Sequence, residues 1–238
     1  MLSIVVPTLN EEKYLPLLLD SIRRQNTADY EVIVADAGSL DKTVMLAENY
    51  GCRVVAGGVP PKGKNEGARA AKGNFILFID ADVVLPDDFL AKNLKEFESR
   101  NLDLASFMLA AKNIFYNFSF KFLFNFPSLA SEKILPQAMS IILAKNSIHQ
   151  KIGGFNEEIK IGEDLDYVRR GAKIGKFGVL RSVKVITLPR RFQQDGWIVT
   201  WMKYFLCQIC MISLGPVKSD ILKYKFNHYS KSLKNSQK

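Results

Sequence analysis

The chain has 238 residues, of which 47% are hydrophobic, and it carries a formal net charge of +9. This length supplies one full α/β core and is marginal for two, so we expect one domain with a short appendage. Three cysteines are too few for a disulfide framework, and residues 1–7 read as a first strand and not as a secretory signal, which predicts folding in the cytosol.

The positive charge belongs to the last third of the chain, because residues 169–238 hold 15 Lys and Arg against two acids. Such a region can attract nucleic acid, anionic lipid or a phosphorylated substrate, and charge alone does not choose among them. Apolar and aromatic sequence accompanies the charge, without a motif for reading bases. The combination favours a membrane or a lipid phosphate over nucleic acid.

The first hundred residues alternate between short apolar runs and helical patterns. The predicted strands are Leu2–Val6, Glu31–Ala35, Arg53–Ala56 and Phe75–Ile79, and the predicted helices lie near Glu12–Arg24, Lys42–Asn49 and Asn65–Ala71. This alternation predicts an α/β fold with a mainly parallel, Rossmann-like sheet flanked by helices. Ligands bind such a sheet at the carboxyl ends of its strands.

Polar residues follow the first two predicted strands. Thr8, Asn10 and Glu11 come after the first strand and are suited to hydrogen-bond a base or a ribose, although Asn10 would equally serve as a helix cap. Asp36 ends the second strand, where its carboxylate can accept a hydrogen bond from a base N–H, while Asp41 reads as a helix cap. These positions predict a nucleoside site.

Residues 57–65, between the third and fourth strands, read as a flexible loop that carries Lys62 and Lys64 and opens onto a helix. Backbone amides at a helix start, together with ammonium groups, suit a phosphate. The alternative for either residue taken singly is an ordinary solvated lysine.

Asp80 and Asp82 come directly after the fourth strand. Their carboxylates are the hard oxygen ligands that a divalent cation bridging a diphosphate needs. The alternative is that Asp82 caps the next helix, since the acidic segment 86–88 follows. The sequence therefore predicts a metal–nucleotide site or a capped helix.

Four motifs, residues 7–12, 36–43, 64–73 and 80–82, occur in the order and spacing of the family-2 glycosyltransferases of the GT-A fold, which the chain resembles. The resemblance implies a nucleotide site lined by Pro7, Thr8, Glu11 and Asp36. It also implies that Asp80 lies toward the ribose and the base, and that Asp82 touches Mg²⁺ or Mn²⁺.

Gly153–Glu157 and Gly162–Tyr167 look like the Gly-Gly-Phe and Glu-Asp motifs of the same family, and the second motif opens a helix. The resemblance implies an inverting transfer, in which Asp164 is the general base that takes the proton from the acceptor hydroxyl. The alternative is that Glu163, Asp164 and Asp166 only complement the helix dipole.

Arg190 and Arg191 resemble a basic element that lies near the diphosphate in relatives. Gly196 stands where the processive enzymes of the family carry an arginine, so processive polymer synthesis is not expected. The resemblance covers about residues 1–195, with a donor half (1–100) and an acceptor half (101–195). An apolar helix and a basic tail follow over residues 196–238.

Two apolar segments bear on the acceptor. Half of residues 113–126 are aromatic, with a polar stripe at Asn113, Asn117, Lys121 and Asn125. This pattern predicts a helix that lies against a bilayer or is buried against the second segment. That segment, residues 197–214, contains Lys203 and Gln208, so a monotopic association is favoured over a membrane span, with an oligomer contact or buried helix as the other alternative.

The expected function is a Mg²⁺- or Mn²⁺-dependent, inverting transfer of a sugar from a UDP- or GDP-type donor. The expected acceptor is a polyprenyl phosphate or a lipid-linked saccharide at the cytoplasmic face of the membrane, and no nucleic-acid partner is expected. The alternatives are a soluble transferase acting on a small saccharide or protein, and a non-catalytic nucleotide-sugar-binding protein of the same fold. The tail from Lys218 onward is expected to rest on anionic headgroups or to be disordered.

Overall fold

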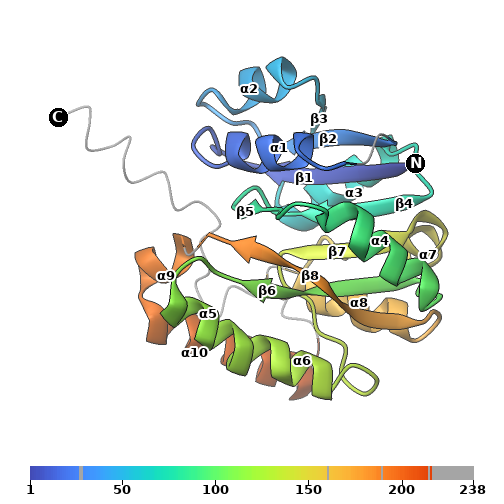
Figure 1. Ribbon diagram of the computed structural model, residues 1–238, viewed down its shortest axis with the longest axis vertical. Coiled ribbons are helices and arrows are strands. Elements are labelled where there is room, and N and C mark those ends of the chain that lie inside the picture. The colour runs from blue at the N-terminus through green and yellow to red at the C-terminus, as the bar shows by residue number, and fades with distance from the viewer. Residues whose placement is uncertain (27–28, 160, 189, 214, 216–238) are drawn as a thin grey trace.

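The computed structural model describes residues 1–238 except 27–28, 160, 189, 214 and 216–238, so the basic tail lies outside the described residues. Within the described part, eight strands form one sheet in the order β3-β2-β1-β4-β7-β6-β8-β5 (Figure 1). Alternate residues of the first strand enter different apolar clusters, Ile4 and Val6 on one face and Val5 on the other. The sheet is therefore covered on both faces, which explains why its strands read as continuous apolar runs.

The four strands predicted in the donor half are all present and pair in parallel. They are β1 (Leu2–Thr8), β2 (Tyr30–Asp36), β3 (Arg53–Ala56) and β4 (Phe75–Ile79). The helices between them are α1 (Leu15–Arg23), α2 (Thr43–Asn49) and α3 (Pro60–Ala70). Parallel pairing brings the carboxyl ends of β1 and β2 together, with Thr8 beside Asp36.

The prediction of a flexible loop over residues 57–65 is wrong, because α3 already begins at Pro60. Proline favours the first turn of a helix, where its missing N–H needs no partner and its φ is already helical. Lys62 is exposed on this helix, whereas Lys64 is buried with 2% of its surface accessible. The two lysines therefore have different environments.

The remaining strands are β5 (Val83–Val84), β6 (Leu104–Ala110), β7 (Ile141–Lys145) and β8 (Phe177–Thr187). β7 runs antiparallel to both β4 and β6, β5 runs antiparallel to β8, and β6 is parallel to β8. The helices of this region are α4 (Phe89–Ser99), α7 (Asn146–Lys151) and α8 (Glu163–Ala172). The sheet is thus parallel in the donor half and mixed beyond it.

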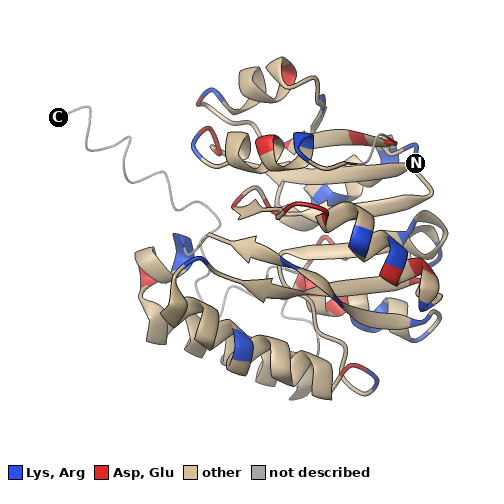
Figure 2. Cartoon of the chain, in the orientation of Figure 1, with Lys and Arg blue, Asp and Glu red and all other residues tan. Residues whose placement is uncertain are grey.

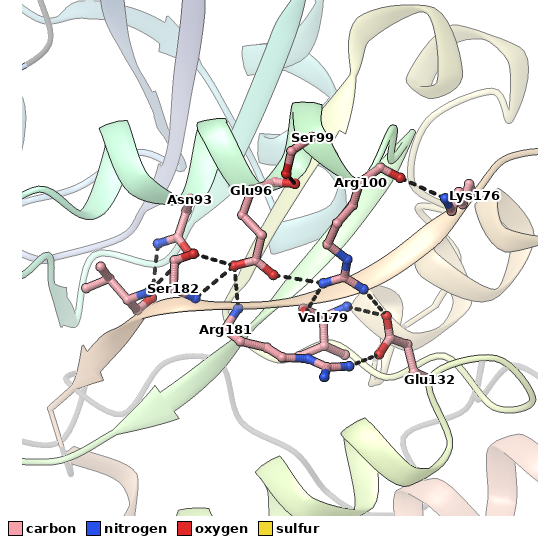
Figure 3. Close-up of polar contacts among 10 residues, drawn as sticks. Asn93, Glu96, Ser99, Arg100, Glu132, Lys176, Val179, Arg181 and Ser182 are labelled. Carbon is pink, nitrogen blue, oxygen red and sulfur yellow. Dashed lines mark hydrogen bonds and ion pairs between the residues drawn. The ribbon is translucent and has the colours of Figure 1, made fainter.

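A polar network fixes α4 against β8 (Figure 3). Glu96 Oε2 accepts hydrogen bonds from the backbone N–H of Arg181 at 2.9 Å and of Ser182 at 2.8 Å. Arg100 binds Glu96 at 2.8 Å and also pairs with Glu132, which in turn pairs with Arg181 at 2.6 Å. These contacts hold β8, the strand that leads to Arg190, against α4, the last helix of the donor half.

The two apolar segments form helices that pack on each other away from the donor half (Figure 1). The first comprises α5 (Ile114–Phe120), the π-helix η1 (Lys121–Asn125) and α6 (Phe126–Ala130). The second comprises α9 (Arg190–Asp195) and α10 (Trp197–Ser213). Ring contacts join them, with centroids 5.3 Å apart for Phe115 and Trp197 and 6.0 Å apart for Phe120 and Trp201.

The polar stripe of the first segment is mostly exposed. Asn113, Asn117 and Lys121 face solvent, and Asn113 caps α5 by accepting from the N–H of Phe115. Asn125 is the buried member, with both of its amide atoms hydrogen-bonded to the backbone of Leu109 at 2.8 Å. The aromatic side chains divide between two faces, because Phe120 and Phe124 are buried in the core whereas Phe118 and Phe126 are 63% and 68% exposed. The segment therefore presents aromatic side chains on its exposed face as well as on its buried face.

The second segment also presents apolar side chains. On α10, Met202, Phe205 and Ile212 are each more than half exposed. Figure 2 shows that α5, α6 and α10 carry hardly any charge on their ribbons. Among the described helices, none is both long enough and apolar enough to cross a bilayer.

Candidate functional site

A cavity of about 1030 Å³ lies at the carboxyl ends of β1 and β4. Eight of the residues singled out in the sequence line it: Pro7, Thr8, Glu11, Asp80, Asp82, Asp164, Arg190 and Arg191. Asp36 and Lys64 lie behind this lining and contact it. The structure thus brings together side chains that come from both halves of the chain.

Asp36 organises the turn after β2. Its Oδ1 accepts hydrogen bonds from the hydroxyls of Thr8 at 2.9 Å and Ser39 at 2.6 Å, and its Oδ2 accepts from the backbone N–H of Gly38 at 2.9 Å. Asn10 Oδ1 accepts from the N–H of Leu40 at 2.8 Å, so Asn10 fastens the same turn and does not cap α1, which begins later. This network fixes the end of the cavity at which the sequence predicts a nucleoside.

Arg190 holds two carboxylates from the donor half. Its Nη1 donates to both oxygens of Glu11, at 2.8 and 2.7 Å, and its Nε lies 3.3 Å from Asp82 Oδ2. All three side chains are nearly buried, with 10–13% of their surfaces exposed. Burial raises the pKa of Glu11 to about 7, although the charge of Arg190 acts in the opposite direction. Glu11 and Asp82 together thus bind a cationic group, which in this structure is the guanidinium of Arg190.

Asp82 lies in the turn between β4 and β5, and α4 begins only at Phe89, so the capping alternative for Asp82 is wrong. The described residues contain no group of three or more His, Cys, Asp or Glu side chains arranged around a metal ion. A metal that bridges a diphosphate needs only one or two protein carboxylates, because phosphate oxygens and water complete its shell. Asp82, which already faces a cation, fits such a site.

Asp164 is held from two sides. Lys64 Nζ donates to Asp164 Oδ1 at 2.5 Å and to Glu163 Oε1 at 3.1 Å, and the backbone N–H of Ser140 donates to Asp164 Oδ2 at 3.2 Å. Burial alone would lower the pKa of Lys64, but the charges of Asp164 and Glu163 outweigh it and raise that pKa above its usual range. Lys64 is therefore a charged positioning partner of the candidate base.

Asp80 lines the same cavity as Asp82 and Asp164. Burial raises the pKa of Asp80 to about 6, against the opposing charge of Lys64 and with the help of the nearby Asp164. Its backbone N–H donates to the carbonyl of Ser140 at 3.0 Å. Ser140 thus bonds the backbone of Asp80 and the carboxylate of Asp164, and it does so with a φ of 62°, a left-handed conformation that costs free energy in a residue other than glycine.

The Gly-Gly-Phe motif and the Lys-Asn motif of α3 contact each other. Asn65 donates to the carbonyl of Phe155 at 2.9 Å and accepts from its N–H at 2.8 Å. Gly154 has a φ of +73°, and a Cβ there would lie 2.6 Å from Asn65 Oδ1, so only glycine fits. Phe155 stacks on Tyr167 of α8 with ring centroids 4.0 Å apart. These contacts orient α8, which carries Asp164.

The three acids at the start of α8 have different partners. Glu163 and Asp164 both bind Lys64, whereas Asp166 pairs with Arg170 at 2.7 Å one turn along the helix. Asp164 and Glu163 line the cavity and Asp166 does not. The alternative that all three acids serve only the helix dipole does not describe this arrangement.

Sequence reasoning missed several residues of the site. Ser140 carries no motif, and its role depends on a backbone conformation that the sequence does not announce. Trp201 and Tyr204 line the cavity from α10, as does Gln208, whose amide donates to Gln137 across the cavity at 3.2 Å. The four-residue spacing of Trp197, Trp201 and Phe205 is the signal that could have assigned one face of α10 to a site.

Comparison with known proteins assigns the chain to a protein family. The family model of glycosyl transferase family 2 matches residues 3–151. The chain belongs to this family. The resemblance drawn from the four donor motifs is thereby confirmed, and with it the assignment to a family of transferase enzymes.

Among curated members of the family, an uncharacterized glycosyltransferase of Haemophilus influenzae is 28% identical over 180 residues, which are 71% of this chain and 60% of the relative. The poly(ribitol-phosphate) β-N-acetylglucosaminyltransferase TarS of Staphylococcus aureus is 36% identical over 90 residues, which are 34% of this chain and 16% of TarS. The chain thus spans at most 60% of the length of these relatives.

Solved structures confirm the GT-A type of fold. TarS residues 1–349 in complex with UDP-GlcNAc superposes with a TM-score of 0.64 at 23% identity, covering 78% of this chain and 58% of that one. A mannosyltransferase of Pyrobaculum calidifontis in complex with GDP-Man and Mn²⁺ gives a TM-score of 0.63 at 20% identity, covering 80% and 57%. The glucosyl-3-phosphoglycerate synthase of Mycobacterium tuberculosis, solved with Mn²⁺ and UDP-Glc, gives 0.59 at 20%, covering 88% and 79%.

Proposed function

We propose that this glycosyltransferase moves a sugar, with inversion, from a nucleoside-diphosphate sugar to an acceptor at a membrane surface. The observation that carries the proposal is that Asp80, Asp82 and Asp164 line the same cavity, together with Arg190 and Arg191. Structural relatives that bind UDP-GlcNAc, UDP-Glc and GDP-Man support a nucleotide-sugar donor.

In this proposal the nucleoside lies beside Thr8 and the turn held by Asp36, and Asp80 binds the ribose. Asp82 would hold a Mg²⁺ or Mn²⁺ ion, which would neutralise charge on the leaving diphosphate. The relatives solved with Mn²⁺ support this assignment. Arg190 and Arg191 add positive charge on the same side of the cavity, so Arg190 exchanges its carboxylate partners for phosphate oxygens when the donor arrives.

Asp164 is proposed as the general base. Its carboxylate lines the cavity, and Lys64 and the N–H of Ser140 fix its orientation at 2.5 and 3.2 Å. As the acceptor oxygen attacks the anomeric carbon from the side opposite the diphosphate, the proton passes to Asp164. Positioning of the base by two hydrogen bonds lowers the entropy cost of that step.

The exposed apolar faces of α5, α6 and α10 support an acceptor at a membrane. Aromatic and aliphatic side chains on these helices are exposed beside a few polar ones, an arrangement suited to the interface of a bilayer. The acceptor classes proposed are a polyprenyl phosphate and a lipid-linked saccharide, and the association is peripheral, on the cytoplasmic face.

The experiment that tests the function is a thermal-shift panel of UDP-, GDP- and dTDP-sugars with and without Mn²⁺, followed by an assay of nucleoside diphosphate release. A donor that binds the folded state raises the melting temperature by mass action. Metal-dependent stabilisation with release of nucleoside diphosphate supports the enzyme. Stabilisation without release supports a non-catalytic binding protein, and release that needs only a water-soluble saccharide supports a soluble transferase.

A further inference from the structure

The cavity extends well beyond its charged end. Its volume of about 1030 Å³ is at the top of the range of about 300–1,000 Å³ that is usual for small-molecule sites. The extension runs between η1, α6 and α10. The apolar side chains that form its walls are Phe122, Leu123, Leu135, Met139, Ile161, Trp197, Trp201, Met202, Phe205 and Ile212.

The apolar walls begin immediately beside the candidate base. Ile161 and Leu165, which flank Glu163 and Asp164 in the chain, pack with Cys207 and Met211 of α10 in one buried cluster. Gly162 between them is so close to α10 that a Cβ would lie 3.1 Å from Cys207 Sγ. The attacking atom of an acceptor in this space must therefore be close to the apolar part of the same molecule.

The charge of the lining argues against a second phosphate. Five carboxylates line the described cavity, from Glu11, Asp80, Asp82, Glu163 and Asp164, against three cationic side chains, from Arg190, Arg191 and Lys203. Two further charged side chains lie behind the lining: Lys64 binds Glu163 and Asp164, and Asp195 binds Lys203 at 2.8 Å. The positive charge of Lys64 and the negative charge of Asp195 cancel in this count. Carboxylates thus outnumber cationic side chains in the lining, although burial raises the pKa of Glu11 to about 7 and that of Asp80 to about 6, so the described lining offers no excess positive charge to a second phosphate once the donor diphosphate is bound.

We infer, on the basis of the proposed function, that the acceptor is a single-chain lipid whose attacking group is a neutral hydroxyl and whose apolar chain lies between η1, α6 and α10. This selects the hydroxyl-bearing class over a lipid phosphate. A phosphate monoester is largely ionised at neutral pH, with a second pKa of about 6, so its attacking oxygen has no proton to give to Asp164. A base held beside an apolar wall suits an alcohol.

The reaction that follows from this assignment is balanced without a further reactant. The acceptor oxygen forms a bond to the anomeric carbon, and the bond from that carbon to the diphosphate oxygen breaks. The electron pair of the broken bond leaves with the nucleoside diphosphate. The hydroxyl proton goes to Asp164.

The test uses the two tryptophans of the chain, Trp197 and Trp201, both of which line the cavity. Their fluorescence reports directly on occupancy. The probes are dodecyl β-glucoside, which has neutral hydroxyls, dodecyl phosphate, which has the same chain and an anionic head, and methyl β-glucoside, which lacks the chain. All are used below the concentration at which micelles form, on the full chain with Mn²⁺ and a donor that binds.

We expect dodecyl β-glucoside to give a saturable fluorescence change and to raise nucleoside diphosphate release. Methyl β-glucoside should need a concentration at least about tenfold higher to reach the same release, because burial of the apolar chain drives binding. Dodecyl phosphate should not raise release. Faster release with dodecyl phosphate than with dodecyl β-glucoside would overturn the choice of a hydroxyl. Equal potency of the methyl and dodecyl glucosides would overturn the chain site.

A matched pair of variants on α10 locates the chain. Met202→Gln changes a residue that lines the cavity, and Ile209→Gln changes one that does not, while both side chains are about half exposed. Met202→Gln should weaken binding of dodecyl β-glucoside by about tenfold, and Ile209→Gln should leave it unchanged; equal effects of both variants would overturn the location. Failure of the proposed function is distinguished because it would appear as absent donor binding, or as donor binding with no nucleoside diphosphate release for any acceptor, whereas the chain site is read from the fluorescence change with the dodecyl and methyl glucosides.

Discussion

Lys64 shows how one buried side chain can organise a site. It lies on α3, 2% exposed, and its ammonium group is within 3.1 Å of Glu163 and 2.5 Å of Asp164. A charged group in this environment is stable only because its partners are also present, since an unpaired buried charge carries a large desolvation cost. The start of α8 and the placement of Asp164, the proposed base, therefore depend on the same lysine.

We expect Lys64→Met to lower the free energy of unfolding by about 3–5 kcal/mol, because it leaves two carboxylates at the cavity without their cation. Lys62→Met, two residues earlier on the exposed side of α3, should change it by no more than about 0.5 kcal/mol. Urea denaturation of both variants measures the difference. Equal stability of the two variants would contradict a structural ion pair at Lys64.

We expect Asp82→Asn to lose most metal-dependent donor binding while the fold survives, because an amide is a weaker ligand than a carboxylate for a hard cation. Calorimetric titration with the preferred nucleoside-diphosphate sugar and Mn²⁺ measures this effect. Circular dichroism serves as the control for folding. Unchanged donor affinity at saturating Mn²⁺ would remove Asp82 from the metal site.

At the scale of elements, the strands of the donor half were predictable because buried parallel strands are short apolar runs bounded by turns, and all four matched within two residues at each end. The start of α3 was missed because Pro60-Pro61 and the nearby glycines read as loop, although proline is favoured in a first turn. The candidate residues were predictable from motif order, but Ser140 and the Gln137–Gln208 contact are products of tertiary structure alone.

The packing of α7 against α8 carries a pH dependence. His149 of α7 lies among Phe78, Phe155 and Tyr167, with its Nδ1 3.0 Å from the hydroxyl of Tyr167. Burial lowers the pKa of His149 from 6.5 to about 4, and the charge of Arg170 acts in the same direction. The unfolded chain therefore binds more protons than the folded protein between these two values.

By linkage, this histidine makes the protein more stable as the pH rises from about 4 to about 6.5, and its contribution is lost as the pH falls through that range. We expect the free energy of unfolding to drop by about 2 kcal/mol from this source between about pH 7.5 and about pH 5. His149→Gln, which cannot take up a proton, should show a drop smaller by that amount. Parallel pH dependences for the variant and the wild type would contradict a buried neutral His149.

The exposure of aromatic side chains on α5 and α6 was only half predictable. The sequence predicted a polar stripe, but it did not predict that Asn125 would be buried through hydrogen bonds to the backbone of β6 while Asn113, Asn117 and Lys121 stay exposed. The exposed face then includes aromatic side chains such as Phe118 and Phe126. An exposed apolar surface of this kind favours contact with a membrane or a second protein surface.

We expect the full chain to bind vesicles that contain anionic lipid, and each of Phe118→Gln and Phe126→Gln to weaken the binding by about tenfold through lost apolar transfer. Ile174→Gln, at an exposed position in the turn after α8, is the control and should have no effect. Sedimentation with vesicles measures the binding, and 1 M salt should reduce it because the Debye length falls to about 3 Å. Absence of binding at low salt would assign the surface to contact between protein chains.

At the scale of the whole molecule, the cavity lined by Asp82 and Asp164 forms where the donor half and the acceptor half contact each other. Glu11 and Asp82 come from the donor half and Arg190 from the segment after β8, while Lys64 of the donor half binds Asp164 of the acceptor half. The network of Glu96, Arg100 and Glu132 keeps β8 in register for this meeting. Strand alternation in one half could predict where ligands bind, but not which side chains the other half would deliver.

The central claim is that Asp164 is the base for sugar transfer from a nucleoside-diphosphate donor, and Asp164→Asn tests it most directly. Donor affinity by calorimetry and nucleoside diphosphate release are measured on the wild type and the variant under the same conditions. We predict donor affinity within about twofold of the wild type and release slower by about 10²–10⁴, the usual contribution of general-base catalysis. Retention of more than about a tenth of the wild-type rate, with donor binding intact, would contradict the account and move the role to another carboxylate, with Glu163 the nearest.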